Sequence, residues 1–335
     1  MKQLEYVPQR PLTAIALGRA GVDLYPHERH ATLRQATSFE KHMGGSPANI
    51  AAALGRLGSK VGFLGRVSQD QLGQYVLETL KDFGVDTSQI VQDDSGSRTS
   101  LAFAELRPAD CDVLIYRNNA ADLLLCPDDI DEAYIARASA LVISGTALSA
   151  SPSREAVFTA LGYARRNDTI VVFDIDYRPY SWQSPQEVSV YCGMVAEGSD
   201  IIIGNREEFD AVEQLYGLTG DDVDHRSAQY WLAQRAQLVI VKRGPRGCTA
   251  YDRSGDQFLC PPFPVETMKP VGAGDAFAGA MLHDLLRGET IPHAVTRGAA
   301  AAALVVSRPS CSDASPTEDE LTAFLKERKE HALAR

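Results

Sequence analysis

The 335-residue chain lacks the features typical of membrane-bound, secreted and nucleic-acid-binding proteins. Its longest unbroken apolar run, residues 299–306, is too short to cross a bilayer. Residues 1–12 contain no apolar core of a signal peptide. Positive charge is scarce, because 33 Lys and Arg residues against 44 Asp and Glu residues give a net charge of −11. We therefore expect a cytoplasmic protein with no nucleic-acid partner and no membrane partner.

Paired cysteine and histidine motifs are also missing. The six cysteines are widely scattered and form no CxxC pair, so we interpret them as reduced thiols. The seven histidines show no HExxH or related spacing, and we assign no histidine a catalytic role. No internal repeat or low-complexity tract interrupts the chain.

Short β-rich segments alternate with amphipathic helical segments along most of the chain. Leu72, Val76, Leu80 and Phe83, for example, recur at helical spacing. The predicted strands are 14–17, 61–64, 140–144, 170–174, 201–204 and 238–242, and the predicted helices are 46–57, 72–83, 153–166, 184–196 and 206–215. This alternation predicts an α/β fold of right-handed βαβ units, with a mostly parallel sheet covered by helices on both faces.

Residues 24–40 and 97–118 interrupt this alternation. They contain strand-like patches, such as 99–106 and 113–117, without helical periodicity between them. Strands that leave the main sheet at two points can pair as a small accessory sheet. We predict that this sheet folds over a ligand cleft as a lid, within a single domain of residues 1–335. Two long surface hairpins are the alternative.

The segment VGAGDAFAGA, residues 271–280, is the most informative stretch. Gly272, Ala273 and Gly274 are small enough to turn tightly into a helix whose first N–H groups point outward. Such N–H groups at the positive end of a helix dipole form an anion site. Asp275 lies inside that site, where a carboxylate is useful as a base beside a phosphoryl group. The alternative is an N-terminal cap of the helix.

Two further segments suit sugar binding. The segment GRAGVD, residues 18–23, falls short of a GxGxxG motif, so a dinucleotide fold is not favoured. Asp23 at a strand's carboxyl end suits hydrogen bonding to sugar hydroxyls. Gly44 and Gly45 let the backbone approach a ligand closely, and Ser46 is a good N-cap. Asn49 offers both a donor and an acceptor.

Charged residues cluster after the predicted strand 170–174. Strand alternation places Asp174, Asp176 and Arg178 on one face of a strand that ends at Pro179. Three charges on a buried strand are costly without ligands, and the Arg178 guanidinium matches a carboxylate or keto-acid. Arg117 in the predicted lid could supply a second positive contact. For the three charged residues of the strand, the alternative is an internal ion-pair network. For Arg117, the alternative is an ordinary surface arginine.

Two segments near the carboxyl-terminal half suit a nucleotide and a metal. Asn205 and Glu208 lie three residues apart, so both face one direction on a helix and suit the water shell of Mg²⁺. The same pair forms a capping box that needs no metal. Lys242 ends the predicted strand 238–242, and Gly244 and Gly247 follow it. This segment suits a polyphosphate, although a plain hairpin turn has a similar composition.

These motifs in this order resemble the ribokinase-like (PfkB) carbohydrate kinases, with residues 44–49 similar to the first family signature and 271–280 to the second. The resemblance covers nearly the whole chain. It implies a ribokinase-like three-layer α/β/α sandwich with a small β-sheet lid. It also implies ATP and Mg²⁺, leaves room for a monovalent cation such as K⁺, and suggests a homodimer joined through the lids. Pro270 and Val271 stand where many relatives have two threonines.

The resemblance implies a role for each matching residue. Asp275 is expected to deprotonate a primary hydroxyl, with the N–H groups of 272–274 holding the phosphoryl group. The sugar acid is expected to contact Asp23, Gly44, Gly45, Asn49, Asp176, Arg178 and Arg117, with the arginines at its carboxylate end. The nucleotide and Mg²⁺, the metal held through water, are expected to contact Asn205, Glu208, Lys242, Gly244 and Gly247.

A narrower resemblance concerns the substrate. Residues 18–26, 44–47, 174–180, 307–313 and 316–317 resemble kinases of keto-deoxy sugar acids. They imply phosphorylation of the terminal primary hydroxyl of 5-dehydro-2-deoxy-D-gluconate, an acid of myo-inositol breakdown. The alternatives are 2-keto-3-deoxygluconate or a simpler sugar such as fructose. A non-catalytic sugar or nucleotide sensor on the same scaffold is a further alternative.

Overall fold

A ten-stranded sheet forms the centre of the molecule. The computed structural model describes residues 1–218 and 220–333; residues 219, 334 and 335 of the predicted domain lie outside the described residues. The strand order is β14-β13-β12-β11-β10-β9-β1-β4-β5, and β6 pairs with β4. Pairing is parallel from β12 to β5 and antiparallel for β13 and β14 at one edge. The strands are β1 (Leu12–Leu17), β4 (Val61–Ser68), β5 (Val85–Asp86), β6 (Ile90–Asp93), β9 (Ala138–Ser144), β10 (Ile170–Asp174), β11 (Ile201–Asn205), β12 (Leu238–Lys242), β13 (Cys248–Asp252) and β14 (Gln257–Cys260).

Both faces of the central sheet are buried, which explains why its strands are rich in aliphatic residues. In β1, Ala14 and Ala16 pack into the core on one face, whereas Ile15 and Leu17 pack into the core on the other. Successive side chains of a strand point to opposite faces, so each inner strand contributes to both cores. A continuous apolar strand is therefore what this position requires.

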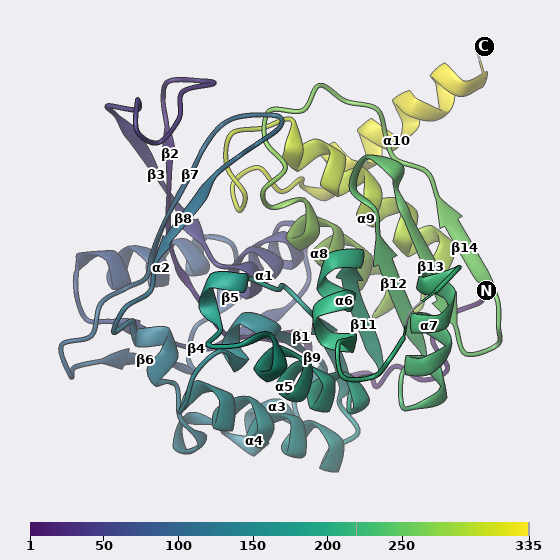
Figure 1. The fold of residues 1–335 in the computed structure, drawn as a ribbon, viewed down its shortest axis with the longest axis horizontal. Helices are drawn as coiled ribbons and strands as arrows, with labels where there is room; N and C mark the ends of the chain where they lie inside the picture. The colour runs from purple at the N-terminus through teal and green to yellow at the C-terminus, as the bar shows by residue number, and fades with distance from the viewer. Residues whose placement is uncertain (219, 334–335) are drawn as a thin grey trace.

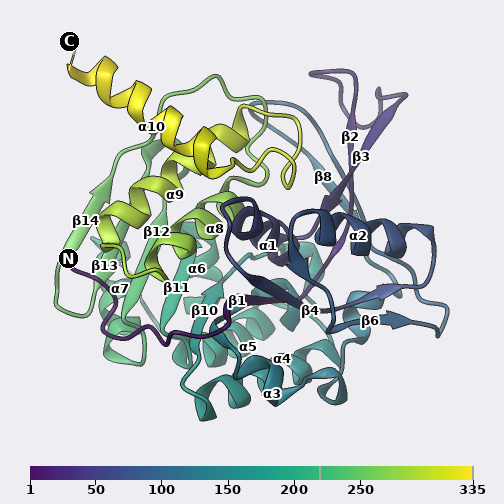
Figure 2. The same cartoon turned by 180° about the vertical axis from the view of Figure 1, so that it is seen from behind.

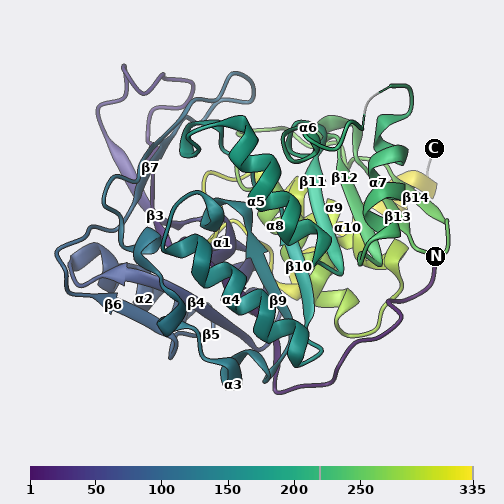
Figure 3. The ribbon, with the colours of Figure 1, turned by 60° about the horizontal axis from the view of Figure 1, so that its bottom comes forward.

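Helices cover both faces of the sheet. One layer contains α1 (Ser46–Arg56), α2 (Gln71–Asp82), α8 (Ala273–Leu285) and α9 (Ile291–Val306), with α10 (Glu318–Leu333) packed against α9 (Figure 2). The other layer contains α3 (Glu132–Ile135), α4 (Ser153–Arg166), α5 (Pro185–Glu197), α6 (Arg206–Glu213) and α7 (Val223–Ala233) (Figure 3). The predicted three-layer α/β/α architecture is confirmed. No helix within residues 1–218 and 220–333 is long and apolar enough to span a membrane.

A second, four-stranded sheet rises from one side of the molecule (Figure 1). Its order is β3-β2-β7-β8, with β2 (Gly21–Pro26), β3 (Phe39–Gly44), β7 (Leu101–Ala104) and β8 (Val113–Tyr116). The predicted accessory sheet is confirmed. Its first two strands span residues 21–44 and so extend beyond the predicted segment 24–40 at both ends. Antiparallel pairing of β2 with β3 continues to the Gly21–Gly44 pair, where the two strands meet the body of the protein.

Several predicted elements match closely and others were missed. The helix 153–166 and the strands 170–174 and 238–242 have the predicted bounds. The prediction of a strand continuing to Pro179 is wrong, because β10 ends at Asp174 and Asp176 has φ +40°. The short strands β5 and β6 and the antiparallel pair β13 and β14 were not predicted. β5, β6 and β14 have only two, four and four residues, so their sequences show little periodicity.

Candidate active site

A cavity of about 700 Å³ lies between the small sheet and the carboxyl ends of the parallel strands. This is the edge where ligands bind in open α/β sheets. Among the residues expected to act in catalysis or to bind sugar, nucleotide or metal, those that line it are Asp23, Gly45, Asn49, Arg117, Asp176, Arg178, Asn205, Glu208, Lys242, Gly244, Gly272, Ala273, Gly274 and Asp275.

Gly44 and Gly247 lie behind this lining. A Cβ atom on Gly44 would lie 1.8 Å from the carboxylate oxygen Oδ1 of Asp23, so only glycine leaves room for that carboxylate. A Cβ atom on Gly247 would lie 2.1 Å from the carbonyl oxygen of Cys260. Both glycines shape the site by packing rather than by facing the cavity. Asp23 itself lies within β2, which corrects its predicted place at the carboxyl end of a strand.

The turn into α8 places free backbone donors in the cavity. Gly272 has a left-handed φ of +86°, and the helix begins at Ala273. A Cβ atom on Gly272 would lie 2.5 Å from the Sγ atom of Cys311, so the turn packs closely against the segment after α9. The first N–H groups of a helix have no partner within it. Gly272, Ala273 and Gly274 line the cavity, so the start of α8 and the positive end of its dipole lie at the cavity, an arrangement that suits an anion.

Asp275 lies in the first turn of α8 and is held by α1. Its Oδ2 atom accepts a hydrogen bond of 2.8 Å from Nδ2 of Asn49. Burial and the neighbouring Asp176 carboxylate raise the pKa of Asp275 to about 6, although the hydrogen bond from Asn49 and the nearby Ser46 hydroxyl oppose the rise. Helix α8 has no side-chain cap, so Asp275 is not its N-cap. At neutral pH the group is largely ionised and is basic enough to accept a proton.

The prediction of Ser46 as an N-cap is wrong. The cap of α1 is Gly45, with φ +104° and no side-chain cap bond, and Ser46 is already helical. A Cβ atom on Gly45 would lie 2.3 Å from the carbonyl oxygen of Arg19, so the chain enters α1 through a contact only glycine permits. The Ser46 hydroxyl therefore caps no helix N–H, and its oxygen is buried without a hydrogen-bond partner.

A buried cluster joins the ends of β10, β12 and α6. The ammonium of Lys242 lies 3.4 Å from Oδ1 of Asp174 and 3.8 Å from Oε2 of Glu208. Burial raises the pKa of Asp174 to about 7, with Lys242 opposing the rise. A Cβ atom on Gly274 would lie 3.1 Å from the Lys242 ammonium, so this charge lies beside the first turn of α8.

Asp176 and Arg178 form an ion pair at the mouth of the cavity. Oδ1 of Asp176 lies 2.7 Å from a terminal nitrogen of Arg178, and Oδ2 accepts hydrogen bonds from Ser144 and Thr146. The neighbouring Asp176 carboxylate raises the pKa of Arg178 above its usual range. The structure thus contains the ion pair that was the alternative to ligand binding, and it also directs Arg178 into the cavity.

Arg117 follows β8 and is anchored to the body of the protein. Its Nε atom donates to Asp122 at 2.7 Å, and its NH1 atom donates to the carbonyl oxygen of Thr146 at 2.9 Å and to Ser149 at 3.1 Å. The guanidinium lines the cavity but has most of its donors engaged.

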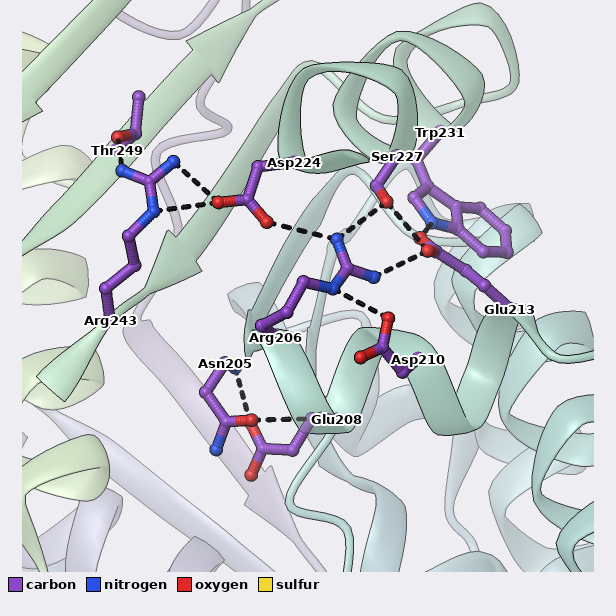
Figure 4. Close-up of polar contacts among 10 residues, drawn as sticks. All are labelled: Asn205, Arg206, Glu208, Asp210, Glu213, Asp224, Ser227, Trp231, Arg243 and Thr249. Carbon is purple, nitrogen blue, oxygen red and sulfur yellow. Dashed lines mark hydrogen bonds and ion pairs between the residues drawn. The ribbon is translucent and has the colours of Figure 1, made fainter. Parts of the chain in front are cut away.

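Asn205 and Glu208 form the capping box of α6 (Figure 4). The N–H of Glu208 donates to Oδ1 of Asn205 at 2.9 Å, and the N–H of Asn205 donates to Oε2 of Glu208 at 2.7 Å. The box leaves Oε1 of Glu208 without a role in capping. Residues 1–218 and 220–333 contain no group of three His, Cys, Asp or Glu side chains placed to hold a metal.

A polar network fixes α6 relative to the turn after β12 (Figure 4). Arg206 donates to Asp210, Glu213, Asp224 and Ser227. Asp224 also accepts a hydrogen bond of 2.7 Å from Arg243, the residue after β12. The network therefore positions the capping box beside Lys242 and Gly244.

Two buried cations near the candidate site were not predicted. Arg19, between β1 and β2, is 8% exposed and lines the cavity. Lys269 is fully buried, and its ammonium donates to the carbonyl oxygen of Val271 at 2.6 Å. The only signal for Arg19 was its place in the GRAG turn, and Lys269 carries no local signal at all.

The fold and cavity define a class of enzyme. The chain matches the description "pfkB family carbohydrate kinase" over residues 13–318 and belongs to that family. It is 48% identical to the 5-dehydro-2-deoxygluconokinase of Geobacillus kaustophilus, with all of both chains covered. It is 47% identical to the 5-dehydro-2-deoxygluconokinase of Photobacterium profundum, over 98% of this chain and 99% of the relative. A fructokinase with bound ATP from Xylella fastidiosa has a TM-score of 0.81 and 26% identity, over 95% of this chain and 99% of that one. The resemblance predicted from the motifs is confirmed.

Proposed function

We propose that this kinase transfers the γ-phosphoryl group of ATP to the terminal primary hydroxyl of 5-dehydro-2-deoxy-D-gluconate in the cytoplasm. The observation that carries the proposal is Asp275, a carboxylate of raised pKa in the first turn of α8. It shares its cavity with Arg117 and Arg178, whose guanidinium groups suit an acidic substrate. Two relatives at 47–48% identity are named 5-dehydro-2-deoxygluconokinase.

Asp275 acts as the base in this proposal. It accepts the proton of the substrate hydroxyl as the hydroxyl oxygen bonds to the γ-phosphorus, and the bond from that phosphorus to the β-γ bridging oxygen breaks to release ADP. Asn49 orients the carboxylate. The N–H groups at the start of α8 hold the oxygens of the transferring phosphoryl group, and Lys242 adds positive charge beside them.

Mg²⁺ fits the residues present in a water-mediated role. Glu208 has one carboxylate oxygen outside the capping box, and Mg²⁺ usually keeps several waters while binding one or two carboxylates and substrate phosphates. When bound, it neutralises charge on the phosphates. Asn205 and Glu208 hold its water shell in this proposal, and Lys242 and Gly244 border the nucleotide.

A monovalent cation fits the residues less well. Val271 offers no hydroxyl, and the Lys269 ammonium already donates to its carbonyl oxygen at 2.6 Å. We therefore expect turnover to be similar in potassium and sodium salts, and strong activation by K⁺ would contradict this expectation.

The small sheet is proposed to act as a lid and a dimer interface. Ala102 and Ile115 line the cavity and exclude water when the lid closes. On the opposite face, Leu114 and Tyr116 are 48% and 54% exposed, which suits a second copy of this chain. Light scattering should show a dimer for the wild type and a monomer for Leu114→Lys; a monomeric wild type contradicts the dimer.

An ADP-release assay tests the substrate assignment. The panel contains 5-dehydro-2-deoxy-D-gluconate, 2-keto-3-deoxygluconate and fructose, and Asp275→Asn controls for contaminating kinases. We expect the highest kcat/KM for the first compound. If 2-keto-3-deoxygluconate or fructose is preferred, that compound takes the place of 5-dehydro-2-deoxy-D-gluconate in the proposal. Fructose is included because a fructokinase has a similar structure. If none of the three compounds causes ADP release, the result supports the alternative of a non-catalytic sensor.

A further inference from the structure

Arg19 differs from the other two arginines of the cavity in how its guanidinium is bonded. The Arg117 and Arg178 guanidinium groups each contact a carboxylate closely, that of Asp122 or Asp176. Arg19 donates from Nε to the hydroxyl of Ser100 at 2.8 Å, but its NH2 atom lies 3.7 Å from Oδ1 of Asp23. That nitrogen and that oxygen are both buried without a hydrogen-bond partner.

Buried polar groups in proteins are nearly always hydrogen-bonded, so an unfilled donor beside an unfilled acceptor calls for an explanation. Both side chains line the cavity. A ligand that offers an acceptor to Arg19 and a hydroxyl to Asp23 would satisfy both atoms once a small shift of the two side chains turns them to the cavity, because neither atom is exposed to solvent in this structure. The pair is thus arranged for a ligand rather than for itself.

Small residues hold Arg19 in place. A Cβ atom on Gly21 would lie 3.2 Å from NH2 of Arg19 and 2.6 Å from Oγ of Ser100. Ser100, at 1% exposed, also accepts a hydrogen bond from the N–H of Val22 through its carbonyl oxygen. The guanidinium is therefore held at the base of the small sheet through Nε, and a shift of its buried terminal nitrogen is the reordering that ligand binding requires.

The three arginines face one region of the cavity. Burial raises the pKa of the Tyr180 hydroxyl, and the guanidinium groups of Arg178, Arg19 and Arg117 all oppose that rise. The three side chains come from the β1–β2 turn, the end of β8 and the segment after β10. Positive charge from three separate elements thus reaches Tyr180, which itself lines the cavity.

We propose that Arg19 is a specificity-determining residue that binds the carboxylate end of the acidic substrate, while Asp23 accepts a hydrogen bond from an adjacent hydroxyl. This inference rests on the proposed function, because it requires a sugar acid. Among the three arginines, Arg19 is the one with an unfilled donor that is not paired within 3 Å of a carboxylate. Guanidinium–carboxylate bonds are among the strongest hydrogen bonds in proteins.

The test compares the acid with its own carboxamide, which keeps the shape and removes the charge. Wild type is expected to prefer 5-dehydro-2-deoxy-D-gluconate over the carboxamide. In Arg19→Met we expect kcat/KM for the acid to fall roughly 10- to 100-fold, mainly through KM, with little change for the carboxamide. Arg19→Lys should recover part of the preference, because it keeps the charge but loses the planar fork.

The matched control is Arg66→Met, which removes a half-buried arginine that pairs with Asp93 and Asp129 outside the cavity. It should keep the wild-type preference for the acid. An equal loss on both compounds in the Arg19 variants would show a structural role and overturn the proposal. If Arg19→Met does not fold, the acid-to-carboxamide ratio of Arg19→Lys decides, and an unchanged ratio overturns the proposal. A wild type that does not phosphorylate the acid refutes the proposed function instead.

Discussion

Replacing Asp275 with Asn tests the base directly. The amide keeps the shape of the side chain but cannot accept the proton, so we expect kcat to fall by roughly 10²- to 10⁴-fold. ATP binding should persist, since the N–H donors of α8 remain and a negative charge beside the phosphates is gone. Coupled ADP release measures the first effect and calorimetric titration with ATP the second. Turnover within tenfold of wild type would refute the assignment.

The pKa of Asp275 adds a quantitative signature. With a value of about 6, roughly nine-tenths of the carboxyl is ionised at pH 7 and one-tenth at pH 5, so kcat/KM should fall about tenfold between them. With the ordinary value of 3.8, the loss would be less than a tenth.

Stability should respond in the opposite sense to activity. Because folding raises this pKa, the ionised carboxyl destabilises the folded state increasingly as pH rises from about 4 to 6. Above pH 6, Asp275→Asn should be more stable than wild type by at most about 3 kcal/mol. Asp94→Asn, which changes an exposed carboxylate after β6, should alter neither property. Parallel stability curves for Asp275→Asn and wild type across this pH range contradict the burial argument.

The remaining predictions concern the surroundings of Asp275. Gly272→Ala should lose about 1–3 kcal/mol of unfolding free energy in thermal denaturation, because φ is +86° and its Cβ atom would meet Cys311; unchanged stability contradicts this. Lys242→Met should lose roughly 3–5 kcal/mol of unfolding free energy at pH 8, because Lys242 opposes the rise in the pKa of Asp174 and its removal leaves a buried carboxyl that is either charged without a partner or protonated against the solution pH. The loss should be smaller at pH 5.5, and an equal loss at both pH values in urea unfolding opposes this account. EDTA should abolish wild-type turnover, and turnover that is unaffected by chelation argues against a metal. Glu208→Gln should raise the Mg²⁺ concentration needed for half-maximal rate.

The amino-acid sequence by itself determined the α/β class, most inner strands and helices, and most of the candidate residues that line the cavity. These features depend on local patterns. Strands such as β10 and β12 are recognisable because both faces are buried, and the turn at Gly272 because its residues are small. Motif spacing was sufficient to identify the family, since the glycines and Asp275 lie within a few residues of one another.

Only the tertiary structure decided how distant residues meet. Asn49 holds Asp275 across 226 positions of sequence, and Gly272 is shaped by Cys311, so neither contact has a local signature. Asp176 reaches the cavity through a left-handed backbone rather than through strand alternation. The environment of Arg19 depends on Ser100 and on the small sheet, which pairs segments that are far apart in the chain. Burial, unfilled hydrogen bonds and raised pKa values come from such contacts, and the sequence pattern does not encode them locally.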